Sequence, residues 1–232
     1  MEEILHEGLA ALSLPTDSTA PLMDFAARLL ETNKVMNLTA ITQPQDVARL
    51  HLLDCAALLN MADFSGKRVV DVGTGAGFPG MPLRILKPDF DLTLLDSLGK
   101  RIAFLQDTCR EMGLERVECV HARAEEFAAV HREQYDIATS RAVAALNVLC
   151  ELALPLVKVG GQFLAMKSVD SDEEIRTAKS AMAQLGGKIE DIRDYTIPGT
   201  HIVHRVVVIR KVKHTPTAFP RTFAKIKKAP LH

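Results

Sequence analysis

A glycine-rich segment at residues 71–80, D-V-G-T-G-A-G-F-P-G, most constrains the fold of this 232-residue chain. It follows the apolar pair Val69 and Val70, which is typical of a buried strand in a parallel sheet. The glycines allow the chain to turn sharply and to bring backbone N–H groups against a ligand. Asp71 at the end of the expected strand would repel a phosphate group, so the segment favours a cationic ligand. A tight strand-to-helix turn without any ligand is the structural alternative.

A second acidic residue follows the glycines by about twenty positions and ends another apolar run at residues 92–96. In that place the carboxylate of Asp96 can accept both ribose hydroxyls of an adenosyl group. NAD and S-adenosylmethionine both carry such a group. The glycines Gly73, Gly75 and Gly77 have the spacing G-x-G-x-G, which differs from the G-x-G-x-x-G of dinucleotide sites and disfavours NAD.

From residue 67 onward, short apolar runs alternate with helical patterns. Strands are expected at residues 68–72, 92–96, 117–121, 135–140 and 162–167, and helices at residues 81–86, 99–112, 146–156 and 172–185. This alternation predicts right-handed βαβ crossovers in a parallel sheet. Two further strands, at residues 188–196 and 204–210, are separated only by a turn at Pro198 and Gly199, so we expect an antiparallel hairpin at the end of the sheet.

The first sixty or so residues have helical periodicity. Apolar positions repeat between residues 22 and 30, and a second helix is expected over residues 44–60, with Pro44 in its first turn. An irregular link at residues 37–41 joins them. We expect three regions: a helical extension at residues 1–62, an α/β domain at residues 63–212 and a basic arm at residues 213–232.

Composition is that of an ordinary globular protein, with 47% hydrophobic and 25% charged residues and a formal net charge of −1. No apolar run approaches the roughly 20 residues that span a bilayer, and the acidic N-terminus argues against a secretory signal. The four cysteines lie far apart, so we expect reduced thiols in the cytoplasm and no metal site. Between Tyr195 and His232 there is no acidic residue, whereas this stretch holds Arg205, Arg210, Lys211, Lys213, Arg221, Lys225, Lys227 and Lys228. Such an arm is either solvated surface or a contact for nucleic acid.

Several motifs occur together in order: N-L-T-A-I at 37–41, H-L-L-D at 51–54, the glycine segment, L-L-D-S-L-G-K-R at 94–101, A-R-A-E-E at 122–126 and S-R-A at 140–142. With them, the chain from about Met36 to Arg210 resembles the small-subunit ribosomal RNA guanine-N7 methyltransferase family, also called glucose-inhibited division protein B. The chain departs from the family pattern in having no Trp before N-L-T and Cys55 where H-x-x-D-S has serine.

The resemblance implies a Rossmann-like class I methyltransferase fold with S-adenosylmethionine as cofactor. It also implies cofactor contacts by Gly73 and Phe78 in the loop, by Ala124 and Glu125 after the third strand, and by Arg141 after the fourth. All of these positions follow the carboxyl ends of parallel strands, where open α/β sheets bind ligands.

Chemistry agrees with these assignments. Asp71 would favour the sulfonium or amino end of the cofactor. Asp96 would accept from the ribose, and Ala124 and Glu125 would border the adenine. For the carboxylate near the adenine, Glu126 is the alternative to Glu125, with the other of the two facing solvent.

Guanine N7 has a free lone pair, so methyl transfer to it requires no general base, and alignment should supply the catalysis. His51 and Asp54 lie three residues apart on an expected helix and so share one face. Either Asp54 accepts from the guanine N1–H and amino group while His51 orients the base or contacts a phosphate, or the two residues form a capping or packing pair. Arg141 has a further expected role in bridging the cofactor and an RNA phosphate.

Positive side chains fix the backbone of RNA when a protein recognises it. We predict RNA contacts for a set of polar and basic residues: Asn37, Lys100, Arg101, Arg221, Lys225, Lys227 and Lys228. The alternative for Asn37 is that it only forms an Asx turn. The alternative for Lys100 and Arg101 is that they are only exposed to solvent.

Together these features predict a cytoplasmic, monomeric S-adenosylmethionine-dependent enzyme that methylates guanine N7 in the ribosomal RNA of the small subunit, either free or within an assembled particle. No membrane is expected as a partner. Two other functions remain open: a non-catalytic RNA-binding assembly factor that retains the fold, and an NAD-dependent oxidoreductase. The latter is disfavoured by the glycine spacing, the terminal hairpin and the lack of a substrate domain.

Overall fold

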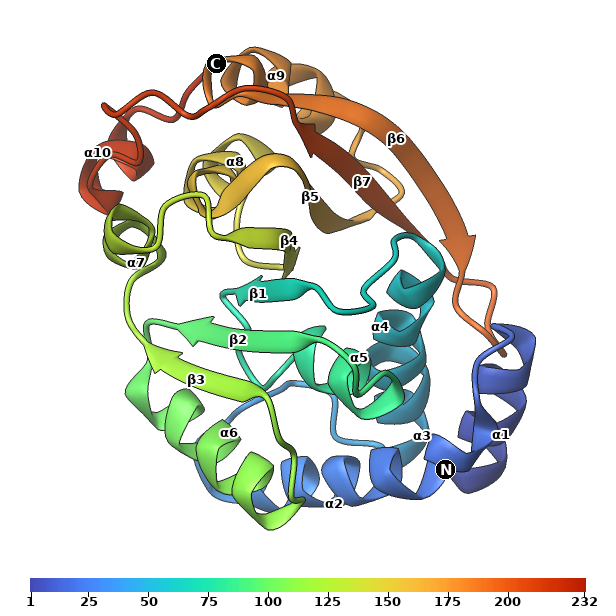
Figure 1. Ribbon diagram of the computed structural model, residues 1–232. Coiled ribbons are helices and arrows are strands. Elements are labelled where there is room, and N and C mark those ends of the chain that lie inside the picture. The colour runs from blue at the N-terminus through green and yellow to red at the C-terminus, as the bar shows by residue number, and fades with distance from the viewer.

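The computed structural model describes residues 1–232 and has a seven-stranded sheet at its centre, in the order β3-β2-β1-β4-β5-β7-β6 (Figure 1). The strands are β1 (Arg68–Val72), β2 (Asp91–Asp96), β3 (Val117–His121), β4 (Tyr135–Arg141), β5 (Val157–Ser168), β6 (Gly187–Thr196) and β7 (Val203–Lys211). Strands β1 to β5 are parallel, and β7 lies antiparallel between β5 and β6. The predicted α/β sheet with a terminal antiparallel hairpin is therefore confirmed.

The strand order reverses at β1, which pairs with β2 on one side and with β4 on the other. In an open α/β sheet such a reversal leaves a crevice at the carboxyl ends of the strands, and ligands bind there. The sheet thus places the ends of β1, β2 and β4 around one crevice.

Helices cover both faces of the sheet (Figure 1). One face carries α1 (Glu2–Ala11), α2 (Thr19–Met36), α3 (Pro44–Val47), α4 (Asp54–Ala56), α5 (Gly80–Leu86) and α6 (Gly99–Glu111). The other carries α7 (Ala124–Val130), α8 (Leu146–Ala153), α9 (Asp172–Gln184) and α10 (Phe223–Lys228). None of these helices combines the length and the apolar character that a membrane span requires.

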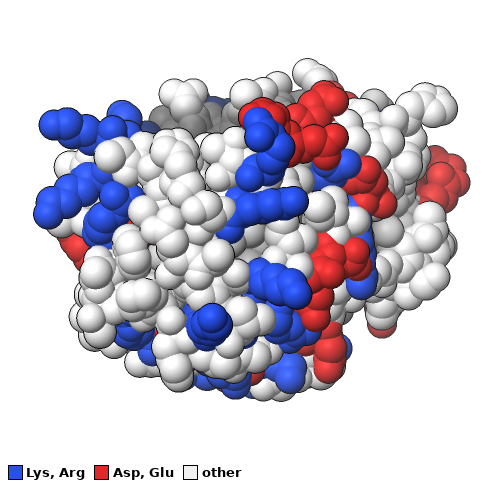
Figure 2. Space-filling model, turned by 90° about the horizontal axis from the view of Figure 1, so that it is seen from above, with Lys and Arg blue, Asp and Glu red and all other residues white.

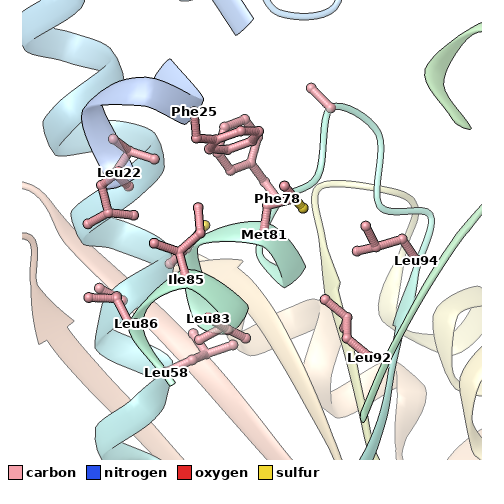
Figure 3. Close-up of a cluster of buried hydrophobic side chains, with 14 of the residues drawn as sticks. Leu22, Phe25, Leu58, Phe78, Met81, Leu83, Ile85, Leu86, Leu92 and Leu94 are labelled. Atoms are coloured by element: carbon pink, nitrogen blue, oxygen red, sulfur yellow. The ribbon is translucent and has the colours of Figure 1, made fainter. Parts of the chain in front are cut away.

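The N-terminal helices share one core with the sheet (Figure 3). Phe25 of α2 packs against Phe78, with ring centroids 5.6 Å apart, and Met81 of α5 lies in the same cluster as Leu94 of β2. Burying each such side chain stabilises the fold by roughly 1.5–3 kcal/mol. Because Phe78 belongs to the glycine-rich segment, this core holds that segment against α2.

The helix predicted over residues 44–60 is confirmed in its extent, although it is not a regular α-helix throughout. After α3 the chain forms a π-helical stretch, η2 (Ala48–Leu53), then α4 and a 3₁₀ turn, η3 (Ala57–Asn60). Every residue from His51 to Leu58 is buried, so the π-helical stretch and the turns that follow it place His51 and Asp54 together in the interior. π-helical turns inside helices occur frequently at functional sites.

Two short helices are absent from the sequence prediction. α7 has seven residues and α10 has six, and both lie in stretches where the sequence predicts no helix. α10 lies within the region predicted as a basic arm, and its Ile226 is fully buried in the core on its face of the sheet.

Candidate active site

A cavity of about 460 Å³ lies at the carboxyl ends of β1, β2 and β4, within the roughly 300–1,000 Å³ typical of small-molecule sites. Most of the residues predicted to contact a cofactor line it. They are Gly73, Gly75, Phe78, Asp96, Ala124, Glu125 and Arg141. The fold therefore brings together side chains from the glycine segment, β2, α7 and β4.

The glycine segment passes close to the chain that follows β4. Gly73 has φ +71°, and a Cβ atom at this position would lie 2.6 Å from Cγ2 of Val143. Only glycine fits this backbone conformation and this close approach without strain. The loop consequently presents bare backbone to the cavity.

Asp96 is held rigidly at the cavity wall, with 5% of its surface exposed. Its Oδ2 accepts from the backbone N–H of Gly75 at 2.9 Å, and its Oδ1 accepts from that of Leu98 at 2.9 Å. A carboxylate has about four acceptor sites, so acceptor capacity remains for hydroxyl groups of a ligand. Arg101, predicted to contact RNA, lies 3.4 Å from the same carboxylate.

Asp71 and Gly77 do not line the cavity, although the sequence predicts cofactor contacts for both. The fully buried carboxylate of Asp71 accepts from Thr74 Oγ1 at 2.7 Å, Gly80 N at 2.9 Å and Thr139 Oγ1 at 3.2 Å. Burial raises its pKa to about 6, and these donors limit the rise. The oxygens of Asp71 thus accept hydrogen bonds from the glycine segment and from β4, and this carboxylate stabilises the turn from beneath.

Arg141 is the centre of a hydrogen-bonded cluster that includes the predicted residues His51 and Asp54. Its Nη1 donates to Asp54 Oδ2 and to the carbonyl of Leu50, both at 3.0 Å, and its Nη2 donates to His51 Nδ1 at 2.8 Å. The guanidinium carbon also lies 4.8 Å from the ring centre of Phe78. The π-helical stretch and β4 are thereby joined at the cavity.

His51 is neutral in this arrangement. A guanidinium can only donate, so Nδ1 of His51 is the acceptor and Nε2 carries the proton, donating to Thr39 Oγ1 at 2.8 Å. Burial, together with the positive charge of Arg141, lowers the pKa of His51 to about 4. The imidazole stacks on Phe78 with ring centroids 4.4 Å apart.

Asp54 is 1% exposed and receives three donors from different elements. Besides Arg141, Tyr195 Oη of β6 donates at 2.7 Å and His204 Nδ1 of β7 at 2.8 Å. Burial by itself raises the pKa of Asp54, but these donors outweigh it and lower the pKa overall. The hydrogen bond between Asp54 and His204 raises the pKa of His204. Asp54 is thus an ionised group directed mainly at protein partners.

A second cavity of about 590 Å³ adjoins the first and shares His51, Arg141 and Ala142 with it. Among its other lining residues are Leu50, Asp54, Met166, Lys167, Ser168, Glu174, Ile202 and His204. His51 and Arg141 therefore stand between two cavities, one against the glycine loop and the other beside β5 and β7.

Sequence reasoning missed Thr39, Tyr195 and His204. Thr39 is fixed by Asn33, whose side chain bonds both its N–H, at 2.8 Å, and its carbonyl, at 3.0 Å. Thr39 belongs to the N-L-T-A-I motif, which was a usable signal. Nothing local marks Tyr195 or His204, because their partner Asp54 lies about 140–150 residues away in the chain.

The residues predicted to contact RNA are dispersed. Asn37 is exposed and ends α2 at φ +50°, and Lys100 is exposed beside it, 3.4 Å from the carbonyl of Met36. Arg221 is paired with Glu151, with Nη2 2.6 Å from Oε2. Three exposed lysines lie on α10: Lys225, Lys227 and Lys228. Figure 2 shows Lys and Arg side chains gathered at the left end of the face seen from above, the end where Figure 1 places α10. Their contacts with RNA stay predictions.

The sequence matches a family model described as rRNA small subunit methyltransferase G over residues 18–203. A protein of Alkaliphilus metalliredigens named ribosomal RNA small subunit methyltransferase G is 46% identical over 223 residues, covering 94% of this chain and 93% of the relative. A Clostridium perfringens protein of the same name is 44% identical over 218 residues, covering 93% and 91%.

Solved structures show the same fold at low sequence identity. TrmN from Thermus thermophilus aligns with a TM-score of 0.53 at 22% identity, covering 68% of this chain and 48% of TrmN. TYW2 of M. jannaschii in complex with AdoMet aligns with a TM-score of 0.53 at 17% identity, covering 68% and 74%. These likenesses confirm the predicted Rossmann-like methyltransferase fold.

Proposed function

Because the chain belongs to the rRNA small subunit methyltransferase G family, we propose that it transfers a methyl group from S-adenosylmethionine to N7 of a guanosine in small-subunit ribosomal RNA. The observation that carries this proposal is the pair of adjoining cavities with His51 and Arg141 between them. One cavity suits the cofactor and the other the base. Methyl transfer requires the two ligands to meet in this way.

The residues of the first cavity fit an adenosyl cofactor. Close approach of a ligand to the chain is possible at Gly73, where a side chain would fill the space. The Asp96 carboxylate offers acceptors for the ribose, and Ala124 with Glu125 would border the adenine. S-adenosylmethionine supplies an electrophilic methyl group when it is bound there.

The second cavity would receive the guanine, which must be unstacked from the RNA to enter it. Arg141 makes three hydrogen bonds within the protein, whereas a guanidinium has five donors. Donors therefore remain to hold guanine O6, which lies beside N7 on the same edge of the base. Arg141 would in this way place N7 towards the first cavity.

The cluster around Arg141 is also compatible with the positive charge that the guanine gains on methylation. Asp54 neutralises Arg141, and His51 is uncharged because its pKa is about 4. Methylated guanine, which carries positive charge, would then not face an uncompensated cation. No side chain has to remove a proton, since N7 carries none.

Incubation of the purified protein with S-adenosylmethionine and small-subunit ribosomal RNA tests the activity, with the modified base mapped and compared with RNA from cells lacking the protein. We expect one N7-methylguanosine. A non-catalytic assembly factor would bind RNA and leave it unmethylated, and an oxidoreductase would bind NAD. Methylation of another atom or of another RNA would contradict the assignment.

The pH dependence of this reaction is a separate prediction. With cofactor and RNA saturating, the single-turnover rate should not rise between about pH 6 and 9, because no general base has to be ionised. His51 is already neutral throughout this range, since its pKa is about 4. A steep rise that follows the deprotonation of one group would favour methylation of an amine or a hydroxyl instead.

The setting of the reaction is also part of the proposal: a monomer in the cytoplasm, acting on the RNA alone or within an assembling particle. All four cysteines are free thiols, which agrees with a reducing compartment. Light scattering on the purified protein checks the monomer. Comparing methylation rates on naked RNA and on small-subunit particles decides between the two substrates.

A further inference from the structure

The C-terminal segment, residues 213–232, is anchored to the domain by a buried carboxylate. Glu151 of α8 is fully buried, and it accepts from Arg221 through the backbone N–H at 2.9 Å, Nε at 2.8 Å and Nη2 at 2.6 Å. Nδ2 of Asn147 donates to the carbonyl of Leu231 at 2.9 Å. Contacts therefore hold the segment on both sides of α10.

Further contacts fix the part of the segment before α10. Arg132 Nη1 donates to the carbonyl of Phe219 at 2.7 Å, and Glu133 Oε1 accepts from the N–H of Thr215 at 2.8 Å. Ile226 of α10 is fully buried. A buried carboxylate whose donors come from one segment attaches that segment to the domain, since an unpaired buried charge would be costly.

Phe223, at the start of α10, lines the first cavity beside Arg123, Glu125 and Leu152. The guanidinium carbon of Arg123 lies 4.4 Å from the ring centre of Phe223, and Arg123 Nε donates to Glu125 Oε1 at 2.6 Å. The ring thus closes the cavity on the β3 side, whereas His51 and Arg141 border it near β4.

The same short helix presents its lysines to solvent. Lys225, Lys227 and Lys228 are exposed, while Phe223 and Ile226 turn towards the protein. We propose that α10 is a wall of the cofactor cavity through Phe223 and that it couples cofactor binding to RNA binding through these three lysines. Phosphates held by the lysines would stabilise the position of α10 in which Phe223 borders the cavity. By linkage, bound cofactor would increase the affinity for RNA by the same factor. The inference rests on the proposed function for the identity of the two ligands.

The wall is tested with a single fluorophore, because the chain contains no Trp. The Phe223→Trp variant should change its emission saturably on titration with S-adenosylhomocysteine. Ala224→Trp, at the exposed neighbouring position, is the matched control and should not respond. An equal response of both variants, or none at Phe223→Trp while calorimetry shows that the variant binds, would overturn the wall.

A Phe223→Ala variant tests the energy of the contact. We expect its affinity for S-adenosylhomocysteine to fall roughly 5- to 10-fold, with Phe223→Leu recovering part of the loss, because an apolar wall returns. Melting curves check that both variants are folded. Unchanged affinity in folded Phe223→Ala would contradict the proposal, whereas a parent protein that does not bind the ligand would contradict the proposed function itself.

The coupling is tested by titrating S-adenosylhomocysteine with and without a saturating small-subunit ribosomal RNA fragment. RNA should tighten binding at least roughly 5-fold in the parent, the lower end of typical coupling. In the Lys225→Gln/Lys227→Gln/Lys228→Gln variant, also saturated with RNA, the gain should be lost. An equal gain in parent and variant would overturn the coupling.

Discussion

Asp54 shows most directly how a single residue shapes the site. Its ionised carboxylate is nearly inaccessible and holds Arg141, Tyr195 and His204. Removing one member of a buried charged cluster leaves the others unpaired in the interior. The loss of stability is therefore large. Asp54 therefore positions the arginine that lies between the two cavities.

The Asp54→Asn substitution should lower the free energy of unfolding by about 3 kcal/mol, because the amide cannot replace the charge and turns a donor towards other donors. Urea denaturation measures this loss. Asp46→Asn, at an exposed position on α3, is the matched control and should change stability by under about 0.5 kcal/mol. A loss at Asp54 as small as that of the control would show that the cluster is not required for folding.

Gly73 and Gly66 share a positive φ but differ in their surroundings. A Cβ atom at Gly73 would meet Val143, whereas at Gly66, with φ +66°, no atom lies within 4 Å. Alanine should cost about 1 kcal/mol of stability at Gly66 through backbone strain, and at least as much at Gly73, where the Cβ atom would also meet Val143. Only Gly73→Ala should also lose affinity for S-adenosylhomocysteine, by roughly tenfold or more. Calorimetric titration of both variants measures it, and equal affinities would remove Gly73 from the cofactor site.

At the scale of elements, the site depends on contacts between segments that are distant in sequence. The link after α2 reaches the π-helical stretch through Thr39 and His51, and that stretch reaches β4 through Arg141. The terminal hairpin joins them through Tyr195 and His204. The hairpin that closes the sheet thus also braces the site.

The hydrogen bond between β7 and the π-helical stretch makes a pH-dependent contribution to stability. Bonding to Asp54 raises the pKa of His204, so its contribution is complete below about pH 6.5, the unfolded value, and is lost as the pH rises through the raised folded value. The stability advantage of the parent over His204→Gln should accordingly shrink above about pH 6.5. Urea denaturation at several pH values measures it, with the exposed His201→Gln as control. An advantage that grows with pH would contradict this sign.

The length and the hydrophobic period of an element decide whether the sequence predicts it. β1 and β3 begin and end at the predicted residues, and valine, which favours strands, occupies three of the five positions of β1 and two of the five of β3. Hydrophobic periodicity does not distinguish a π-helical stretch from an α-helix, so the turn that buries His51 and Asp54 together was not predicted. The position of the glycine segment and of Asp96 at one cavity was predictable because strand, turn and acid are close in sequence. The partners of Asp54 come from the far end of the chain, where only the fold joins them.

At the scale of the whole molecule, charge is divided between internal pairs and free cations. The stretch from Tyr195 to His232 is basic, yet within it Arg221 is paired with Glu151 and Lys211 is paired with Glu133. The lysines of α10 remain exposed, and Figure 2 shows basic side chains gathered at the end of the molecule where Figure 1 places this helix. The positive charge of this stretch that is available to an RNA backbone is therefore smaller than the sequence suggests, and most of it lies on α10.

Replacing Lys225, Lys227 and Lys228 with Gln should weaken RNA binding and flatten its salt dependence. Each phosphate contact on single-stranded RNA contributes about 0.7 to the slope of log affinity against log salt, so losing three contacts should reduce the slope by roughly 2. Filter binding at several salt concentrations measures the slope. A variant with Gln at Lys158, Lys179 and Lys188, three exposed positions on β5, α9 and β6, has the same net charge and is the control. If both variants lose slope equally, RNA senses only the overall charge of the protein; a loss confined to α10 places the RNA backbone beside the helix that carries Phe223.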